Sequence, residues 1–181
     1  MTRIAVLKRA EMNAEQGQVF DAAEKAGNPT GGPYWAYIRY PKMMQASQEM
    51  GNALRAGPLS GRERQIAVLT VVRHWNARFP WAAQVRASLA AGVDQATIDA
   101  INAGKTPDLK DPRERMAHEL PRELLTRKGL SEATYQAAEK LFKLDELVTL
   151  VAAVGQFSMV SCTANAFDIT PPESGAAMLP G

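Results

Sequence analysis

The sequence is poor in the residues that staple small proteins or hold metal ions. Its 181 residues include one cysteine, Cys162, and two histidines, His74 and His118. A single cysteine excludes a disulfide framework and a paired redox thiol within one chain. Two separated histidines without a cysteine cluster give no ligand set for a metal. We therefore expect no metal site and no cofactor.

The chain also lacks a dense run of charge of one sign. It has 21 basic and 19 acidic residues, a balance that does not indicate a nucleic-acid partner. Residues 1–9 do not read as a signal peptide. The most apolar stretch, Leu147–Val160, is too short for a membrane span and contains Thr149, Gln156 and Ser158. We expect a cytoplasmic protein with neither a membrane nor a nucleic-acid partner.

Helix signals are frequent, and no convincing stretch has the period of a strand. Capping patterns stand at Ser60-Gly-Arg-Glu63, at Asp94, at Asp111-Pro112 and at Ser131. The length suits one compact domain over residues 1–181. The sequence therefore predicts a single all-α domain, with helices near residues 11–25, 41–55, 61–76, 80–91, 94–102, 112–121 and beyond, 131–142 and 144–167.

Two of these predicted helices carry further information. Pro121 interrupts the helix that begins at Pro112 and should kink or divide it. The final helix is apolar nearly all round between Leu147 and Val160. Such a helix is expected to be buried on every side, in the core or against another subunit.

Three segments, in this order, carry a resemblance to a known superfamily. They are Gly32–Arg39 (GPYWAYIR), Leu59–Val93 with its motifs LSGRERQIAVL and RHWNARFPWAAQ, and Thr163–Phe167 (TANAF). Over residues 30–170 the chain resembles the carboxymuconolactone decarboxylase and alkyl hydroperoxidase D superfamily. The resemblance implies a helical bundle that forms homotrimers, or larger rings such as homohexamers, through long apolar helices. It also implies chemistry on small molecules: decarboxylation of lactone acids in aromatic catabolism, or thiol-based peroxide reduction.

The chain departs from that superfamily at the positions that carry chemistry. Gln65 stands where a glutamate is usual and Gln84 where a histidine is usual, while Ala77 and Pro80 match two redox cysteines. Peroxide reduction needs a thiolate and a resolving thiol, so thiol peroxidase activity is not expected. A glutamine amide forms hydrogen bonds but does not titrate, so the usual proton relay is absent as well.

The remaining polar residues of the motif suggest a pocket. Each helical residue advances about 100°, so Leu69, Val72 and Asn76 share the face of Gln65, while Trp81, Gln84 and Ser88 form a stripe on the next helix. We expect a pocket walled by Trp81 and Val72. Candidate catalytic residues are Gln65, Gln84 and His74, and candidate substrate-binding residues are Trp81, Asn76, Ser88, Arg39, Arg73, Tyr34 and Asn165.

Each candidate also has a structural interpretation. The two glutamines can be buried, satisfied amides, and His74, which falls opposite Gln65, can be a structural or interface residue. Arg39 and Arg73 can anchor a carboxylate or form ordinary ion pairs. The remaining structural interpretations are packing for Tyr34 and Trp81, backbone satisfaction near a helix end for Asn165, a surface position for His118 and a small core residue for Cys162.

Two functions follow from these observations. The first is a cofactor-free lyase or isomerase that acts on a small carboxylated compound of the aromatic-catabolism type, with amides and arginines positioning the substrate. The second is a non-catalytic, oligomeric small-molecule binder that lost the acid–base site of its superfamily. The substrate is a small molecule in either case, and the protein is expected to be a homo-oligomer.

Overall fold

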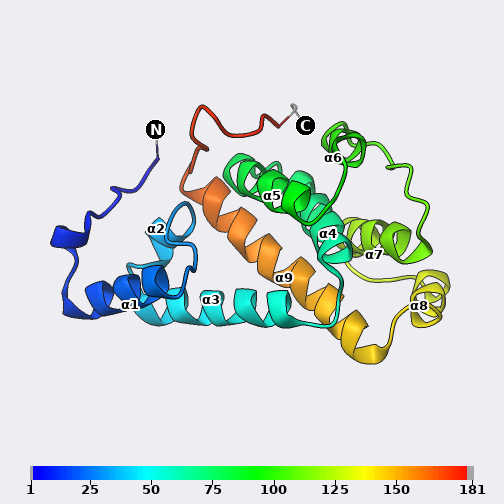
Figure 1. Ribbon diagram of the computed structural model, residues 1–181, viewed down its shortest axis with the longest axis horizontal. Coiled ribbons are helices and arrows are strands. Elements are labelled where there is room, and N and C mark those ends of the chain that lie inside the picture. Colours follow the sequence, from blue (N-terminus) through cyan, green and yellow to red (C-terminus); the bar gives the residue numbers. More distant parts are fainter. Residues whose placement is uncertain (1, 179–181) are drawn as a thin grey trace.

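The structure, a computed structural model, describes residues 2–178. In that range its regular secondary structure consists of helices without strands (Figure 1). This confirms the predicted fold class. Within residues 2–178, a short 3-10 helix, Arg9–Glu11, precedes nine α-helices. These are α1 (Ala14–Lys25), α2 (Tyr34–Tyr37), α3 (Pro41–Ala56), α4 (Gly61–His74), α5 (Arg78–Ala90), α6 (Gln95–Asn102), α7 (Pro112–Arg127), α8 (Glu132–Glu139) and α9 (Leu144–Ala166).

The predicted caps begin the helices as expected. At the start of α4, the Ser60 hydroxyl accepts from the Glu63 amide at 3.2 Å, and the Glu63 carboxylate accepts from the Ser60 amide at 2.8 Å. At the starts of α6 and α8, the Asp94 and Ser131 side chains accept from the Thr97 and Thr134 amides, without a reciprocal bond from the third residue of the helix. Gly92, which follows α5, has a φ of +82°, a conformation that glycine adopts without strain.

Two helices differ from the sequence-based expectation. The first begins at Ala14 because the Asn13 side chain accepts from the Gln16 amide and so sets its start. Pro121 does not divide α7, which continues through it from Pro112 to Arg127. The Pro121 ring is fully buried, and packing of α7 against α4 holds the helix together where local propensity alone would break it.

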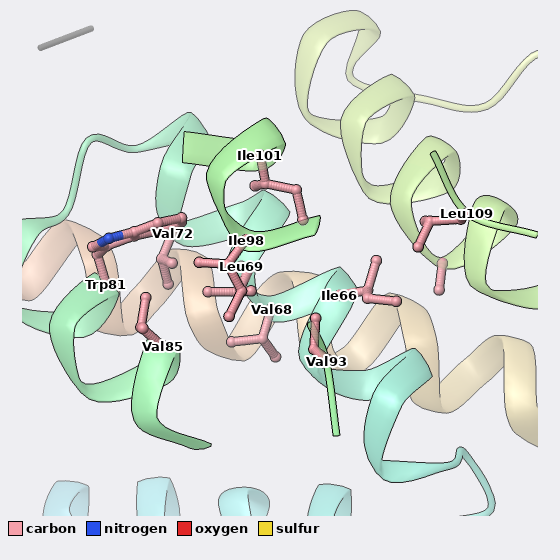
Figure 2. Close-up of a cluster of buried hydrophobic side chains, with 11 residues drawn as sticks. Ile66, Val68, Leu69, Val72, Trp81, Val85, Val93, Ile98, Ile101 and Leu109 are labelled. Atoms are coloured by element: carbon pink, nitrogen blue, oxygen red, sulfur yellow. The ribbon is translucent and has the colours of Figure 1, made fainter. Parts of the chain in front are cut away.

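Helix α4 is the centre of the bundle. It packs against α7, α5 and α9, and its side chains are buried almost without interruption from Glu63 to Val72. Figure 2 shows the main hydrophobic cluster, in which Leu69 and Val72 of α4 meet Trp81 and Val85 of α5 and Ile98 of α6. Burial of this much aliphatic surface drives the association of the helices.

Helix α9 crosses the middle of the molecule (Figure 1), but it is not enclosed by this one chain. Leu150 and Val154 are buried, whereas Leu144, Val148 and Val151 are exposed. The expectation of burial on every side therefore fails within the single chain, and an interface with another subunit stays a prediction. With 23 residues, α9 is also long and apolar enough to cross a membrane by length and composition, a test that core helices pass as well.

Arg113 at the start of α7 ties three parts of the bundle together. Its guanidinium lies 2.5 Å from the Glu63 carboxylate of α4 and 2.7 Å from the Glu146 carboxylate of α9. It also donates to the Leu141 carbonyl at 2.6 Å and stacks over the Phe142 ring. Burial alone would raise the pKa of Glu63, but hydrogen bonds from Arg113 and Ser60 outweigh it and hold that pKa below its usual value.

We expect Arg113→Met to destabilise the fold by about 2–4 kcal/mol, because it leaves the Glu63 carboxylate, 5% exposed, without its partner. Arg127→Gln, which removes a mostly exposed ion pair with Glu123 on the same helix, is the matched control and should cost less than about 1 kcal/mol. Urea unfolding curves of the three proteins give both values. Equal midpoints for the two variants would show that the Arg113 contacts do not hold the bundle.

Candidate functional site

A pocket of about 120 Å³ lies between α3, α5 and α9, and we call it the α3–α5–α9 pocket. Its wall is largely apolar, with proline, phenylalanine and valine side chains. The lining consists of Pro29, Gly31, Pro33, Tyr34, Gly51, Arg55, Phe79, Pro80, Ala83, Gln84, Gln156, Phe157 and Val160. Two predicted site residues, Gln84 and Tyr34, are therefore part of one cavity.

Three polar side chains in this lining differ in how they are held. The Gln156 amide donates to the carbonyl and hydroxyl oxygens of Ser47, both at 3.1 Å, so it is fixed within the fold. Gln84 is half-buried and has no side-chain hydrogen bond within residues 2–178. Arg55 donates to the amide oxygens of Asn28, at 3.1 Å, and of Asn52. Within the described residues, Gln84 therefore has free hydrogen-bonding capacity, and the hydrogen-bond partners of Arg55 are neutral amides.

A second arginine lies close to Arg55. Arg64, on α4, is half-buried and forms no ion pair or side-chain hydrogen bond within the part of the chain that the structure describes. Burial lowers the pKa of Arg64, and the positive charge of Arg55 lowers it further. Two guanidinium groups thus lie near each other without a carboxylate partner in the described chain, an arrangement that an anion would stabilise.

Gln65 lies elsewhere, buried on α4. It is 8% exposed, does not line the α3–α5–α9 pocket, and its Oε1 is sealed from solvent with no donor among the described residues. The Ser88 hydroxyl of α5 is in the same condition. A buried amide oxygen without a donor costs about 1–3 kcal/mol.

The expected wall of Trp81 and Val72 is wrong. Both side chains are fully buried in the dense cluster of Figure 2, where they meet aliphatic neighbours. The Trp81 indole N–H donates to the Ala177 carbonyl at 3.2 Å, so the C-terminal segment also covers this residue. The sequence predicts that Trp81, Gln84 and Ser88 share one pocket face. Trp81 and Ser88, at the two ends of this stripe, are instead buried in packed protein.

The candidates at the C-terminal end of α4 do not reach the α3–α5–α9 pocket. Arg73 donates to the Asn102 carbonyl at 2.7 Å and to the Asn76 side chain. Asn76 has a φ of +48° and follows the end of the helix. His74 is exposed, and its ring meets the Trp75 ring edge to face. Binding or catalytic roles for these three residues stay predictions.

Two further candidates have backbone partners. Arg39 donates to the Ala5 carbonyl at 2.7 Å, and Asn165 donates to the Trp75 carbonyl at 2.6 Å. The second contact is the backbone satisfaction that the sequence allowed for Asn165. Neither residue lines the α3–α5–α9 pocket, so a role in binding stays a prediction for both.

Two expectations about burial are corrected by the structure. His118 was expected on the surface but is 5% exposed, because α7 turns it toward α4. Cys162 was expected in the core but is exposed on α9. Sequence reasoning also missed Arg55 and Phe157, since an arginine near a helix end and a phenylalanine in an apolar helix give no signal of a pocket.

His118 is held as a neutral side chain. Burial, and then the nearby charge of Arg122, lower its pKa to about 4. The Thr70 hydroxyl donates to the Ile66 carbonyl at 2.8 Å and lies 2.9 Å from His118 Nδ1. We assign the proton to Nδ1, which then donates to Thr70, because the single hydrogen of the hydroxyl is directed to the Ile66 carbonyl. Nε2 therefore bears the lone pair.

Comparison with solved structures identifies the fold. An uncharacterized peroxidase-related protein from Ralstonia eutropha JMP134, described as an alkylhydroperoxidase AhpD core, is 19% identical with a TM-score of 0.76 over 95% of this chain and 93% of its own. A peroxidase-related protein from Silicibacter sp. TM1040 is 18% identical with a TM-score of 0.78 over 96% and 93%. A protein of unknown function from Agrobacterium tumefaciens, whose description names AhpD, is 16% identical with a TM-score of 0.67 over 76% and 95%.

These similarities show that the chain has the AhpD-core fold, as the resemblance in the sequence implies. No family model matches the sequence, and no curated protein is significantly similar to it. At identities below one fifth, fold similarity carries no residue-level function. The function must be argued from the site itself.

The neutral state of His118 predicts a pH dependence of stability. The unfolded chain takes up a proton near pH 6.5, whereas the folded chain resists it until about pH 4, so stability falls as the pH drops between these values. From pH 7.5 to pH 4.5 this group should cost about 2.5 kcal/mol. His118→Gln should lose about that much less than the wild type over the same interval, as measured by urea unfolding at each pH. Parallel stability profiles for the two proteins would contradict a neutral, buried His118.

Proposed function

We propose that this protein binds a small carboxylated compound with an apolar body in the α3–α5–α9 pocket. The observation that carries the proposal is Arg55 in the lining of a largely apolar cavity, without a carboxylate partner in the described chain. Arg64, which also lacks such a partner there, is near enough for the charge of Arg55 to act on it. A guanidinium fork matches the two oxygens of a carboxylate, and such pairs are stronger than neutral hydrogen bonds.

The pocket also favours a compact apolar body. Its volume of about 120 Å³ is close to the ~150 Å³ of an engineered cavity that holds one benzene molecule. The Phe79, Pro80 and Phe157 side chains offer contact to a ring or a short hydrocarbon chain. The free amide of Gln84 can form a hydrogen bond with a carbonyl or hydroxyl group of the ligand.

The chemistry of the lining favours binding over acid–base catalysis. Among the described residues, its lining contains no histidine, carboxylate or thiol, the side chains that most often act as general acids or bases. General acid–base catalysis works best with a group that exchanges its proton near the working pH. Binding without turnover therefore requires the fewest acid–base groups beyond those that line the pocket.

A cofactor-free lyase or isomerase is the second candidate function. It is favoured by the Tyr34 side chain, because a phenol can donate a proton to a carbanion or enolate that forms when a carboxylated substrate reacts. Arg55 and Gln84 would then stabilise the negative charge that develops. Thiol peroxidase activity is not part of the proposal, since the one cysteine, Cys162, lies exposed on α9 without a resolving partner in this chain.

We further propose that the protein forms a homotrimer or homohexamer in the cytoplasm. The support is the exposed stripe of Leu144, Val148 and Val151 on α9, which gives a second copy an apolar surface to cover. Size-exclusion chromatography with light scattering distinguishes these states from a monomer.

Benzoate is the probe for the binding proposal, with isothermal titration calorimetry as the measurement. Arg55→Gln should weaken benzoate binding by about tenfold or more, because a charge-assisted hydrogen bond contributes about 1.5–3 kcal/mol. Lys42→Gln removes the same charge from an exposed position near the other end of α3 and should leave the affinity unchanged. Equal affinities for the two variants, or no heat of binding for the wild type at ~10 mM benzoate, would contradict the proposal.

Turnover separates the two candidate functions. If the protein is a lyase or isomerase, proton NMR should show it converting a member of a panel of carboxylated lactones and keto acids. Tyr34→Phe should then lower turnover by about 100-fold or more, in the range of general acid catalysis, while it leaves benzoate affinity within about twofold. No conversion by the wild type, or full activity in Tyr34→Phe, would exclude the proposed role of Tyr34 and leave binding as the function.

A further inference from the structure

A second cavity lies between α4, α6 and α7, and we call it the α4–α6–α7 pocket. Its volume is about 140 Å³. It is lined by Thr70, Arg73 and His74 from α4, by Ile101 from α6, by the loop residues 104–106 and by His118 and Arg122 from α7. Both histidines of the chain therefore border a cavity that the proposed function does not use.

The charge around this pocket is positive. Lys105 and Arg122 line it, no carboxylate does, and neither residue forms an ion pair within residues 2–178. Arg73, at the same rim, is held by the Asn102 carbonyl. Glu119 and Glu123 border the neighbouring groove beside Arg122, where the Glu123 carboxylate accepts from Ser131, at 2.9 Å, and from Thr134. The cavity itself favours an anion.

The floor of the pocket adds a hydrogen-bond acceptor. Because Nδ1 of His118 donates to Thr70, Nε2 carries the lone pair, and Nε2 has no hydrogen-bond partner in the described part of the chain. A neutral imidazole in this tautomer accepts a hydrogen bond there and cannot pair with an anionic oxygen. The ligand must therefore bring a hydroxyl or another donor as well as a negative charge.

We propose that the α4–α6–α7 pocket is a binding site for a small hydroxy acid. Its carboxylate pairs with Arg122 and Lys105, and its hydroxyl donates to Nε2 of His118. The volume suits a molecule no larger than a benzene ring, because the ~150 Å³ cavity that holds benzene is of similar size. Ile101 provides the apolar wall for the carbon body.

The site is independent of the α3–α5–α9 pocket. Among the described residues, the two cavities share no lining residue. Either can therefore be emptied or altered by substitution without direct contact with the other.

The test uses the full-length protein at pH 7, with glycolate as the hydroxy acid and acetate as the matched acid without a hydroxyl. Two histidines in the chain allow their ring nitrogen signals to be assigned by NMR through His118→Gln. Glycolate should shift the Nε2 signal of His118 in a saturable way, and should bind about fivefold more tightly than acetate, since one neutral hydrogen bond contributes about 1 kcal/mol.

Substitutions of exposed arginines complete the test, because they should leave the fold intact. Arg122→Gln should weaken glycolate binding by about tenfold, while Arg127→Gln, on the same helix outside the lining, should leave it unchanged. Arg55→Gln should leave the His118 shift unchanged, which separates this site from the proposed function. The proposal is overturned by any of three results: no shift at ~50 mM glycolate, acetate binding as tightly as glycolate, or equal effects of Arg122→Gln and Arg127→Gln.

Discussion

Nine of the ten residues from Glu63 to Val72 are buried, with Arg64 as the exception, and this enclosure of α4 is the constraint on which the rest of the structure depends. A helix packed on all sides must satisfy its polar groups from its neighbours. Glu63 pairs with Arg113 of α7, and Thr70 forms a hydrogen bond with His118 of α7, so the polar residues of α4 fix the position of α7. Arg113 also pairs with Glu146 and so links α9 to the same contact. The aliphatic residues between them form the cluster of Figure 2.

The same constraint separates the two cavities. Because side chains of α4 fill the middle of the bundle, ligands can enter at its sides, against α3, α5 and α9 or against α6 and α7. Each cavity combines apolar walls with arginine or lysine side chains and lacks carboxylates in its lining. Two proteins with a similar fold are described as peroxidase-related. In this chain the same fold presents side chains suited to bind anions.

The sequence predicts the local structure better than the site. Capping residues such as Ser60 and Asp94 act on amides within one turn, so their effect can be read from spacing alone. Burial of His118 and exposure of Cys162 depend on which face α7 and α9 turn toward α4, which helical periodicity leaves open in charged or uniformly apolar segments. Gln84 and Tyr34 were found because a resemblance named their segments. Arg55 was missed because residues that line the pocket with it, such as Gln84 and Phe157, are distant in sequence.

A crystal structure of the protein soaked with benzoate tests the central claim, that Arg55 binds a carboxylate in the α3–α5–α9 pocket. The account predicts the carboxylate within about 3 Å of the Arg55 guanidinium, as in other charge-assisted pairs, with the ring between Phe157 and Pro80. Benzoate bound elsewhere, or bound in the pocket with its carboxylate turned away from Arg55, would contradict it.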